Sequence, residues 1–400
     1  MVANRRCNPQ VVGIHGDGGA NGMDVDSGSG KSSRKLSVGS QALAAKQLGM
    51  EVQSPFGPDD LYADWELVEA LYGHALRDRL SVKPEEFALL LAEPSHNTRA
   101  NRERLTELVF EGFGAPALYI ARSAMLTSFA TARQTALVVD LGYRSTTAAA
   151  VQDGYVLQKT VTRTPLAGQI LNSAAQAVAD AKYTPLRARC SFTRQEVKPG
   201  EFQVTPVDTT GVSRSFLLYQ VEQVASDLKE STCRASEARF VEMEGQNIPT
   251  TVYELPDGQE LYLGAERFNM AEVLFQPSFV SKFNGLTPLA SDVRSVPEAV
   301  LSCINKCDVD LRKDMYSGAI LSGGTSLMAG LKERLEKDVG ELSPPAAKVK
   351  MLAAANQIER RFSTWIGGSI LASLGSFQQL WMSKKEYAEH GAPLINRKCP

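Results

Sequence analysis

The sequence lacks several features that would assign it quickly to a class. Its 43 Lys and Arg residues nearly balance 45 Asp and Glu residues, which leaves a net charge of -2 and no broad field for nucleic-acid backbones. The six cysteines show no disulfide-framework spacing, and no apolar leader with a cleavage site opens the chain. We therefore expect a reducing compartment, the nucleus or the cytosol, and contact with chromatin only through partners.

Signals for a metal site or a membrane segment are equally scarce. Four histidines are scattered at positions 15, 74, 96 and 390 and supply no ligand cluster beside Cys303 and Cys307. These two cysteines are interpreted as buried thiols on one helix face. The scattered histidines therefore predict no bound metal. Because no apolar run is long enough to cross a bilayer, we also expect no membrane contact.

The composition is otherwise that of a large folded protein. With 400 residues, 43% of them hydrophobic, the chain can bury a core divided between two lobes. Residues 15–40 are rich in Gly, Ser and Asp and predict a flexible insertion. Short basic pieces at Arg5-Arg6 and at residues 31–35 fit either a weak nuclear-import signal or a solvated loop.

Hydrophobic periodicity predicts an α/β fold with mixed sheets. Buried strands are expected at 136–140, 146–151, 156–161 and 319–321. Amphipathic helices are expected at 65–80, 101–113, 215–233, 327–339 and 365–381. The strand at 319–321 runs through Ser322 to Thr325 into a helix, and such a glycine turn is a natural phosphate-binding edge.

The stretch WIGGSILASLGSFQQLWMSKKEYAEHG at 365–391 resembles the C-terminal region of actin almost residue for residue. YELPDGQELYLGAERF at 253–268, ILSGGTSLMAGLKERLEKD at 320–338 and LLLAEPSHNTRANRERLTELVFE at 89–111 are similar to further actin segments. The resemblance to the actin superfamily spans most of residues 36–400. It implies two ribonuclease-H-like lobes flanking a nucleotide cleft: a small lobe of 1–130 plus 363–400, without its opening hairpin, and a large lobe of 131–362.

Three details resemble the nuclear actin-related subunits of chromatin-remodelling and histone acetyltransferase complexes. They are the ending Arg397 to Pro400, the insertion MDVDSGSG and the segment DGYVLQ. The implied partners are actin and a helical scaffold segment of a remodeller ATPase or an acetyltransferase scaffold. The implied location is the nucleus.

The resemblance also implies a nucleotide site, with ATP as cofactor. In this fold two hairpin loops hold the phosphates. The first loop is not found ahead of the segment Pro9 to Gly13. The second loop, 140–146, carries Arg144 where the family has a small residue. The Arg144 side chain would either block a phosphate or replace a cation. The implied cofactor-binding residues are Asp140, Gly142, Gly168, Lys229, Glu230, Gly323, Gly324, Thr325 and Arg361.

Each of these residues also has a plainer interpretation. Asp140 is typical of a strand-end turn, Lys229 and Glu230 of a solvated helix face, and Gly323 with Gly324 of a tight turn. Hydrolysis needs polar groups that orient water, and actin supplies a glutamine and a histidine where this chain has Ser123 and Thr147. We therefore expect no enzymatic activity.

The C-terminal apolar segment is interpreted in two parts. Ile370, Phe377 and Trp381 are assigned to the core, whereas Leu371, Leu374 and Leu380 resemble the family's groove for a partner helix. Two rival functions stay open, an ATP-hydrolysing enzyme of the same superfamily and a cytoskeletal filament protein. The filament is disfavoured because 38–55 is too short for the extended loop that polymerising actin inserts into its neighbour.

We predict that the purified chain hydrolyses ATP no faster than a buffer control. Loss of general-base help alone costs roughly 10²–10⁴-fold in rate. Phosphate release well above background that Asp140→Ala removes would overturn this expectation.

Overall fold

The computed structural model describes residues 11–15, 35–199, 201–240 and 248–400. The chain forms two compact units, each described by itself. The first contains residues up to 84 together with 186–224 and 254–259, and the second contains 85–185, 225–253 and 260–400. The boundaries of these units differ from the boundaries predicted for the two lobes. The division into those lobes therefore stays a prediction.

The first unit is built on a three-stranded antiparallel sheet of order β2-β1-β3. Its strands are β1 (Val12–His15), β2 (Lys35–Val38) and β3 (Met50–Gln53). The rest comprises α1 (Ser40–Ala44), α2 (Trp65–Gly73), β10 (Phe192–Lys198), β11 (Glu201–Pro206) and the start of α6 (Arg214–Thr232). Leu43, Met50 and Phe216 pack together in its core.

The predicted insertion at 15–40 is too long at both ends, and its first residue, His15, belongs to β1. Lys35 to Val38 form β2 and pair with β1, where Lys35 lies opposite His15. Leu36 and Val38 pack against the cluster of Val12, Ile14 and Leu67, which explains why this end is a strand. Residues 16–34 and Arg5-Arg6 lie outside the described residues.

The second unit contains two mixed sheets, so the predicted α/β class is confirmed. The larger sheet has the order β15-β14-β6-β7-β8, with β9 also paired to β7, and the smaller has the order β16-β5-β4. The strands of the larger are β6 (Ala136–Leu141), β7 (Thr146–Gln152), β8 (Tyr155–Val156), β9 (Thr162–Thr164), β14 (Ala319–Ser322) and β15 (Met351–Ala353). The strands of the smaller are β4 (Leu89–Glu93), β5 (Ala117–Arg122) and β16 (Met382–Ser383). A separate ribbon pairs β12 (Thr251–Glu254) with β13 (Glu260–Leu263).

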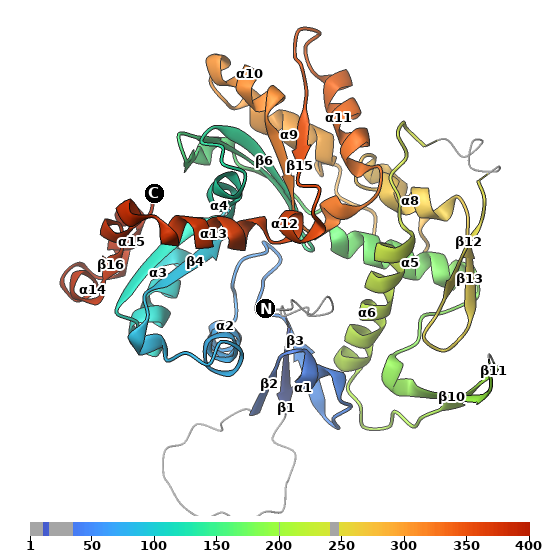
Figure 1. The fold of residues 1–400 in the computed structure, drawn as a ribbon. Helices are drawn as coiled ribbons and strands as arrows, with labels where there is room; N and C mark the ends of the chain where they lie inside the picture. Colours follow the sequence, from blue (N-terminus) through green and yellow to red (C-terminus); the bar gives the residue numbers. More distant parts are fainter. Residues whose placement is uncertain (1–10, 16–34, 200, 241–247) are drawn as a thin grey trace, which may run out of the picture. The chain divides into compact units, whose positions relative to one another are not determined.

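Helices surround these sheets (Figure 1). They are α3 (Arg99–Glu107), α4 (Ser123–Ala130), α5 (Gly168–Ala181), the end of α6, α8 (Glu266–Glu272), α9 (Val296–Asn305), α10 (Val309–Ser317), α11 (Leu331–Leu342), α12 (Gln357–Arg361), α13 (Ser363–Ser373), α14 (Lys384–His390) and α15 (Ile395–Lys398). Two predicted helices, 65–80 and 101–113, end instead in π-helical turns, His74–Arg79 and Leu108–Gly112. The predicted helix at 365–381 ends at Ser373 and continues as a 3₁₀ turn, Gly375–Gln379.

Helices α4 and α13 approach each other at the level of the backbone. A Cβ atom added to Gly367 on α13 would lie 1.7 Å from the carbonyl oxygen of Leu126 on α4. Hydroxyl groups line the same contact, where Thr127 Oγ1 lies 3.2 Å from Thr364 Oγ1. This contact requires glycine at position 367.

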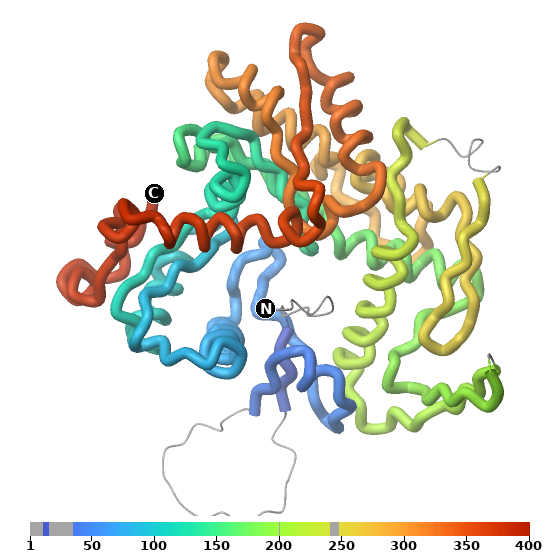
Figure 2. The backbone as a smooth tube through the Cα atoms, viewed as in Figure 1, coloured from blue at the N-terminus to red at the C-terminus, as the bar shows by residue number. Residues whose placement is uncertain are grey.

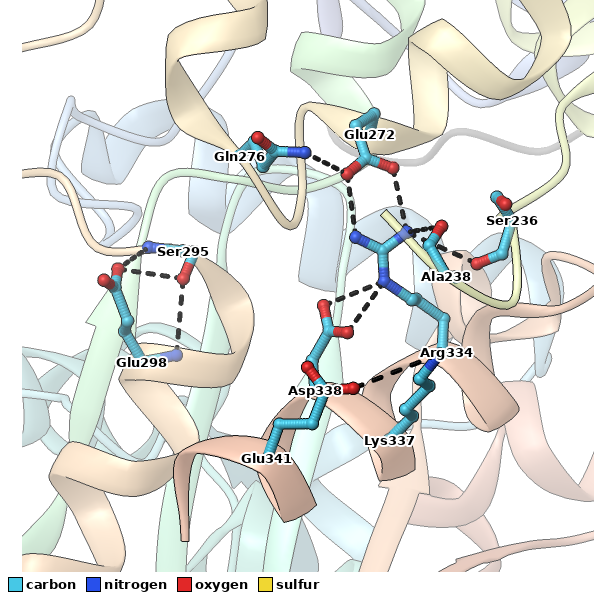
Figure 3. A network of polar contacts seen from close by, with 10 residues as sticks. All are labelled: Ser236, Ala238, Glu272, Gln276, Ser295, Glu298, Arg334, Lys337, Asp338 and Glu341. Carbon is cyan, nitrogen blue, oxygen red and sulfur yellow. Dashed lines mark hydrogen bonds and ion pairs between the residues drawn. The ribbon is translucent and has the colours of Figure 1, made fainter. Parts of the chain in front are cut away.

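A buried ion-pair network joins three parts of the second unit (Figure 3). Arg334 on α11 is 1% exposed, and its Nη2 donates to Glu272 Oε1 on α8 at 2.7 Å. Its Nε donates to Asp338 at 2.9 Å, and its Nη1 donates to the carbonyl of Ala238 at 2.8 Å. A single guanidinium therefore holds α11, α8 and the segment after α6 together.

The C-terminal segment packs beside a segment nearly 300 positions earlier, as the neighbouring red and cyan-blue parts of the tube show (Figure 2). Arg102 on α3 donates to Asn396 on α15 and to the carbonyl of Cys399. Asn396 in turn donates to Glu103 at 2.6 Å. These contacts fix α15 against α3.

Cys303 and Cys307 are both buried, as predicted, but they do not share a helix face, because α9 ends at Asn305 and Cys307 follows it. Burial raises the pKa of Cys303 to about 12, so its thiol stays protonated at neutral pH. Within the described residues, no helix combines the length and the apolar character needed to cross a membrane.

We expect Gly367→Ala to destabilise the protein by about 1–3 kcal/mol, because the added methyl group forces α4 and α13 apart. The matched control is Gly375→Ala, where a Cβ atom meets nothing within 4 Å. Thermal unfolding followed by circular dichroism compares the two variants. Equal melting temperatures would show that the helix pair tolerates the extra volume.

Candidate nucleotide site

The centre of the site lies at the carboxyl ends of the parallel strands β6 and β14. The two strands pair Asp140 with Ser322, and Ser322 Oγ donates to Asp140 Oδ1 at 3.2 Å. After β6 the chain turns back into β7, closed by a hydrogen bond of 3.1 Å from Gly142 N to the Ser145 carbonyl. Ligands bind at such carboxyl ends in α/β sheets, because the loops there are free to shape a pocket.

Gly323 allows the turn after β14 to lie against this hairpin. Its φ angle is +87°, and a Cβ atom on it would lie 2.3 Å from the Leu141 carbonyl oxygen. Gly323 N also donates to the carbonyl of Arg360 at 3.3 Å. Any side chain at position 323 would therefore separate the two strand ends.

Four of the predicted residues meet beside this turn. Gly168 N, at the start of α5, donates to the Gly142 carbonyl at 3.1 Å, and Thr325 Oγ1 donates to the same oxygen at 2.7 Å. A Cβ atom on Gly168 would lie 3.0 Å from Thr325 Oγ1 and 3.3 Å from Lys229 Nζ. The absence of a side chain at Gly168 thus leaves a hydroxyl and an ammonium group around one small space.

The other predicted residues differ in how closely they join this cluster. Lys229 is buried, so its interpretation as a solvated helix residue is wrong, whereas the neighbouring Glu230 is exposed and accepts from Ser226 Oγ at 3.4 Å. Arg361 is exposed, and its Nε would lie 3.9 Å from a Cβ atom on Gly324. Arg361 therefore lies at the rim of the glycine turn.

The sequence interpretation missed Arg360, which secures this rim. Arg360 Nε donates to the Ala354 carbonyl at 2.9 Å, and its Nη1 donates to the Ser326 carbonyl at 3.2 Å. The residue ties α12 to the turn that follows β14. Only its position beside Arg361 could have pointed to it.

The two positions expected to orient water hold weakly basic groups. Ser123 is the first residue of α4, and its Oγ lies 3.2 Å from Ser95 Oγ. Thr147 lies opposite Asp140 in the β6–β7 pair and opposite Arg163 in the β7–β9 pair. Neither side chain is a general base of the strength that a histidine would supply.

The predicted partner groove needs one correction. Leu371 is only 4% exposed, whereas Leu374 and Leu380 are 41% and 46% exposed. Leu371 follows Gly367 by one helical turn and therefore shares the face that packs on α4. Ile370, assigned to the core from the sequence, is instead exposed, while Phe377 is buried as expected.

Comparison with known proteins identifies the relatives of this chain. The actin family profile matches residues 3–400. Actin-related protein 4 of Arabidopsis thaliana is 50% identical over 370 residues, covering 92% of this chain and 84% of the relative. The proteins of the same name from Oryza sativa subsp. japonica and Mycosarcoma maydis are 49% and 34% identical, covering 96% and 92% of this chain and 86% and 76% of the relatives.

We expect Gly168→Ala to weaken ATP binding at least about tenfold, because the added methyl group occupies the space between Thr325 and Lys229. Gly340→Ala is the matched control, since a Cβ atom there meets nothing within 4 Å. Isothermal titration calorimetry with ATP measures both variants. Unchanged affinity in Gly168→Ala would place nucleotide elsewhere.

Proposed function

The chain belongs to the actin family, and on this premise we propose that it is a non-catalytic structural subunit of nuclear chromatin-remodelling and histone acetyltransferase complexes. In this role it pairs with actin and with a helical scaffold segment, and it reaches chromatin through these partners. The observation that carries the proposal is the exposure of Ile370, Leu374 and Leu380 on a segment that Leu371 and Phe377 anchor in the core.

These three side chains favour a helical partner. Ile370 and Leu374 are one turn apart near the end of α13, and Leu380 follows the 3₁₀ turn whose Phe377 is buried. An amphipathic helix presents apolar residues at matching intervals of three and four positions. Complete burial of a leucine contributes about 1.5–3 kcal/mol, so these half-exposed residues supply a useful part of a binding interface.

The chemistry around Asp140 supports the non-catalytic part of the proposal. The hydroxyl groups of Ser123 and Thr147 stand where the family places stronger water-orienting groups. The space beside Gly168, with Thr325 and the buried Lys229, favours retention of ATP. Bound nucleotide would then stabilise the fold by mass action without being turned over.

We expect the double variant Leu374→Asp, Leu380→Asp to bind the scaffold helix and actin at least about 10²-fold more weakly, because each aspartate must be desolvated in the interface. Leu342→Asp is the control, since Leu342 is also exposed but lies at the end of α11. The measurement is a pull-down with purified scaffold helix and actin, with circular dichroism to verify folding. Equal capture by the folded double variant and the parent would remove this surface from the proposal.

A further inference from the structure

The segment that follows α5 contains a sequence pattern found once in the chain. A serine or threonine directly before proline occurs six times, at positions 54, 164, 184, 205, 287 and 343. Only Thr184-Pro185 has a cation at the third position after the hydroxyl residue, Arg187, because the other five have Gly, Ala or Asp there. A proline directly after the hydroxyl residue and a base two positions later is the pattern that one class of proline-directed serine/threonine kinases selects.

This segment has the irregular structure that a kinase substrate needs. Residues 184–188 form neither helix nor strand, Tyr183 is 94% exposed, and the Arg187 side chain is 50% exposed. The proline restricts Thr184 to an extended backbone, which is the conformation that kinases bind. Leu186 is only 8% exposed and has to leave its place before the segment enters a kinase groove. Access therefore depends on local opening.

The end of α5 is built in a way that favours such opening. Tyr183 N donates to the Asp180 carbonyl and Thr184 N donates to the Ala179 carbonyl, each at 3.0 Å, which together close the helix. This closure requires a left-handed residue, and Tyr183 has a φ angle of +55° where glycine is usual. The strain of a tyrosine in this conformation is released when the end of α5 opens.

The Thr184 hydroxyl lies where a negative charge would be unfavourable. Its Oγ1 donates to the Lys182 carbonyl at 3.1 Å, at the negative end of α5. The Lys182 ammonium lies 2.6 Å from Glu266 Oε1 and so joins α5 to α8. A phosphate on Oγ1 would lose the donated hydrogen, repel the helix carbonyls and compete with Glu266 for Lys182.

We propose that Thr184 is a phosphorylation site for a proline-directed serine/threonine kinase, and that the phosphate loosens the end of α5 and its ion pair with α8. The kinase transfers the γ-phosphoryl group of ATP. The bond from Thr184 Oγ1 to phosphorus forms, and the bond from this phosphorus to the oxygen shared with the β-phosphate breaks. The hydroxyl proton passes to the aspartate base of the kinase, and ADP leaves.

The product carries about −1.5 to −2 charges at neutral pH. The proposal does not depend on the apolar surface of α13 or on a nucleotide bound by this chain, so it can fail separately from the proposed function.

The first experiment incubates the folded full chain with a purified cyclin-dependent kinase and MgATP and maps the phosphate by tandem mass spectrometry. The parent should be modified at Thr184, and Thr184→Ala should lose that site. Arg187→Gln should be modified at least about tenfold more slowly, because the kinase loses a charged contact. The matched control is Thr287→Ala, since Thr287 is exposed and precedes a proline but has Ala290 at the third position. This variant should take up as much phosphate as the parent.

The second experiment measures hydrogen exchange before and after the kinase reaction. Amides at the end of α5 should exchange roughly two- to fivefold faster in the phosphorylated parent, as expected for a charge that opposes the helix dipole. Thr184→Ala treated with the same kinase should show no change, which controls for phosphate at any other position.

Two results would overturn the proposal. One is a folded parent that takes up no phosphate at Thr184 while the same kinase modifies a standard peptide substrate, a result that does not depend on whether any variant folds. The other is a parent fully phosphorylated at Thr184 whose α5 amides exchange at the unmodified rate.

Discussion

The close backbone contact between α4 and α13 determines much of what the second unit can do. With Gly367 against the Leu126 carbonyl, the rotation of α13 about its axis is set. Leu371 must then face inward, and Ile370 and Leu374 must face outward. The same contact holds α4, whose first residue is Ser123. One helix pair therefore connects the chemistry at the start of α4 with the apolar surface at the end of α13.

The ion pairs around Arg334 impose a second, more specific constraint. A hydrophobic contact tolerates sliding, whereas a guanidinium that binds two carboxylates and two carbonyls accepts very few arrangements of its neighbours. Buried ion pairs are weak evidence for stability, because desolvation offsets much of the attraction. We interpret Arg334 as a residue that selects one packing of α8 against α11. Through the Ala238 carbonyl, the same guanidinium also holds the segment that follows α6.

The sequence predicted strands better than it predicted side-chain environments. Strands β6 and β14 were predicted almost to the residue, because continuous apolar runs bounded by turns are a strong local signal. The strand predicted at 156–161 is wrong, since β8 ends at Val156 and Gln158–Thr160 form a 3₁₀ turn before β9. The inward face of α13 was predicted wrongly, since a helix that is apolar on several sides does not reveal which side meets another helix. The burial of Arg122 beside Glu93 was missed because it arises from the pairing of β4 with β5, which no local pattern encodes. Lys229 shows the same limit, as a lysine on a helix gives no local sign of burial.

The buried cysteines can serve as probes of local opening in the regions that surround them. Cys233, Cys303 and Cys399 are buried with pKa values raised by burial, so a thiol reagent meets little thiolate while these regions stay closed. Their alkylation rates therefore follow how often the surrounding structure opens rather than the intrinsic reactivity of sulfur. Because Cys303 lies on α9 and Cys399 lies against α3, alkylation mapped by mass spectrometry would time the opening of the core and of the C-terminal segment separately in one sample.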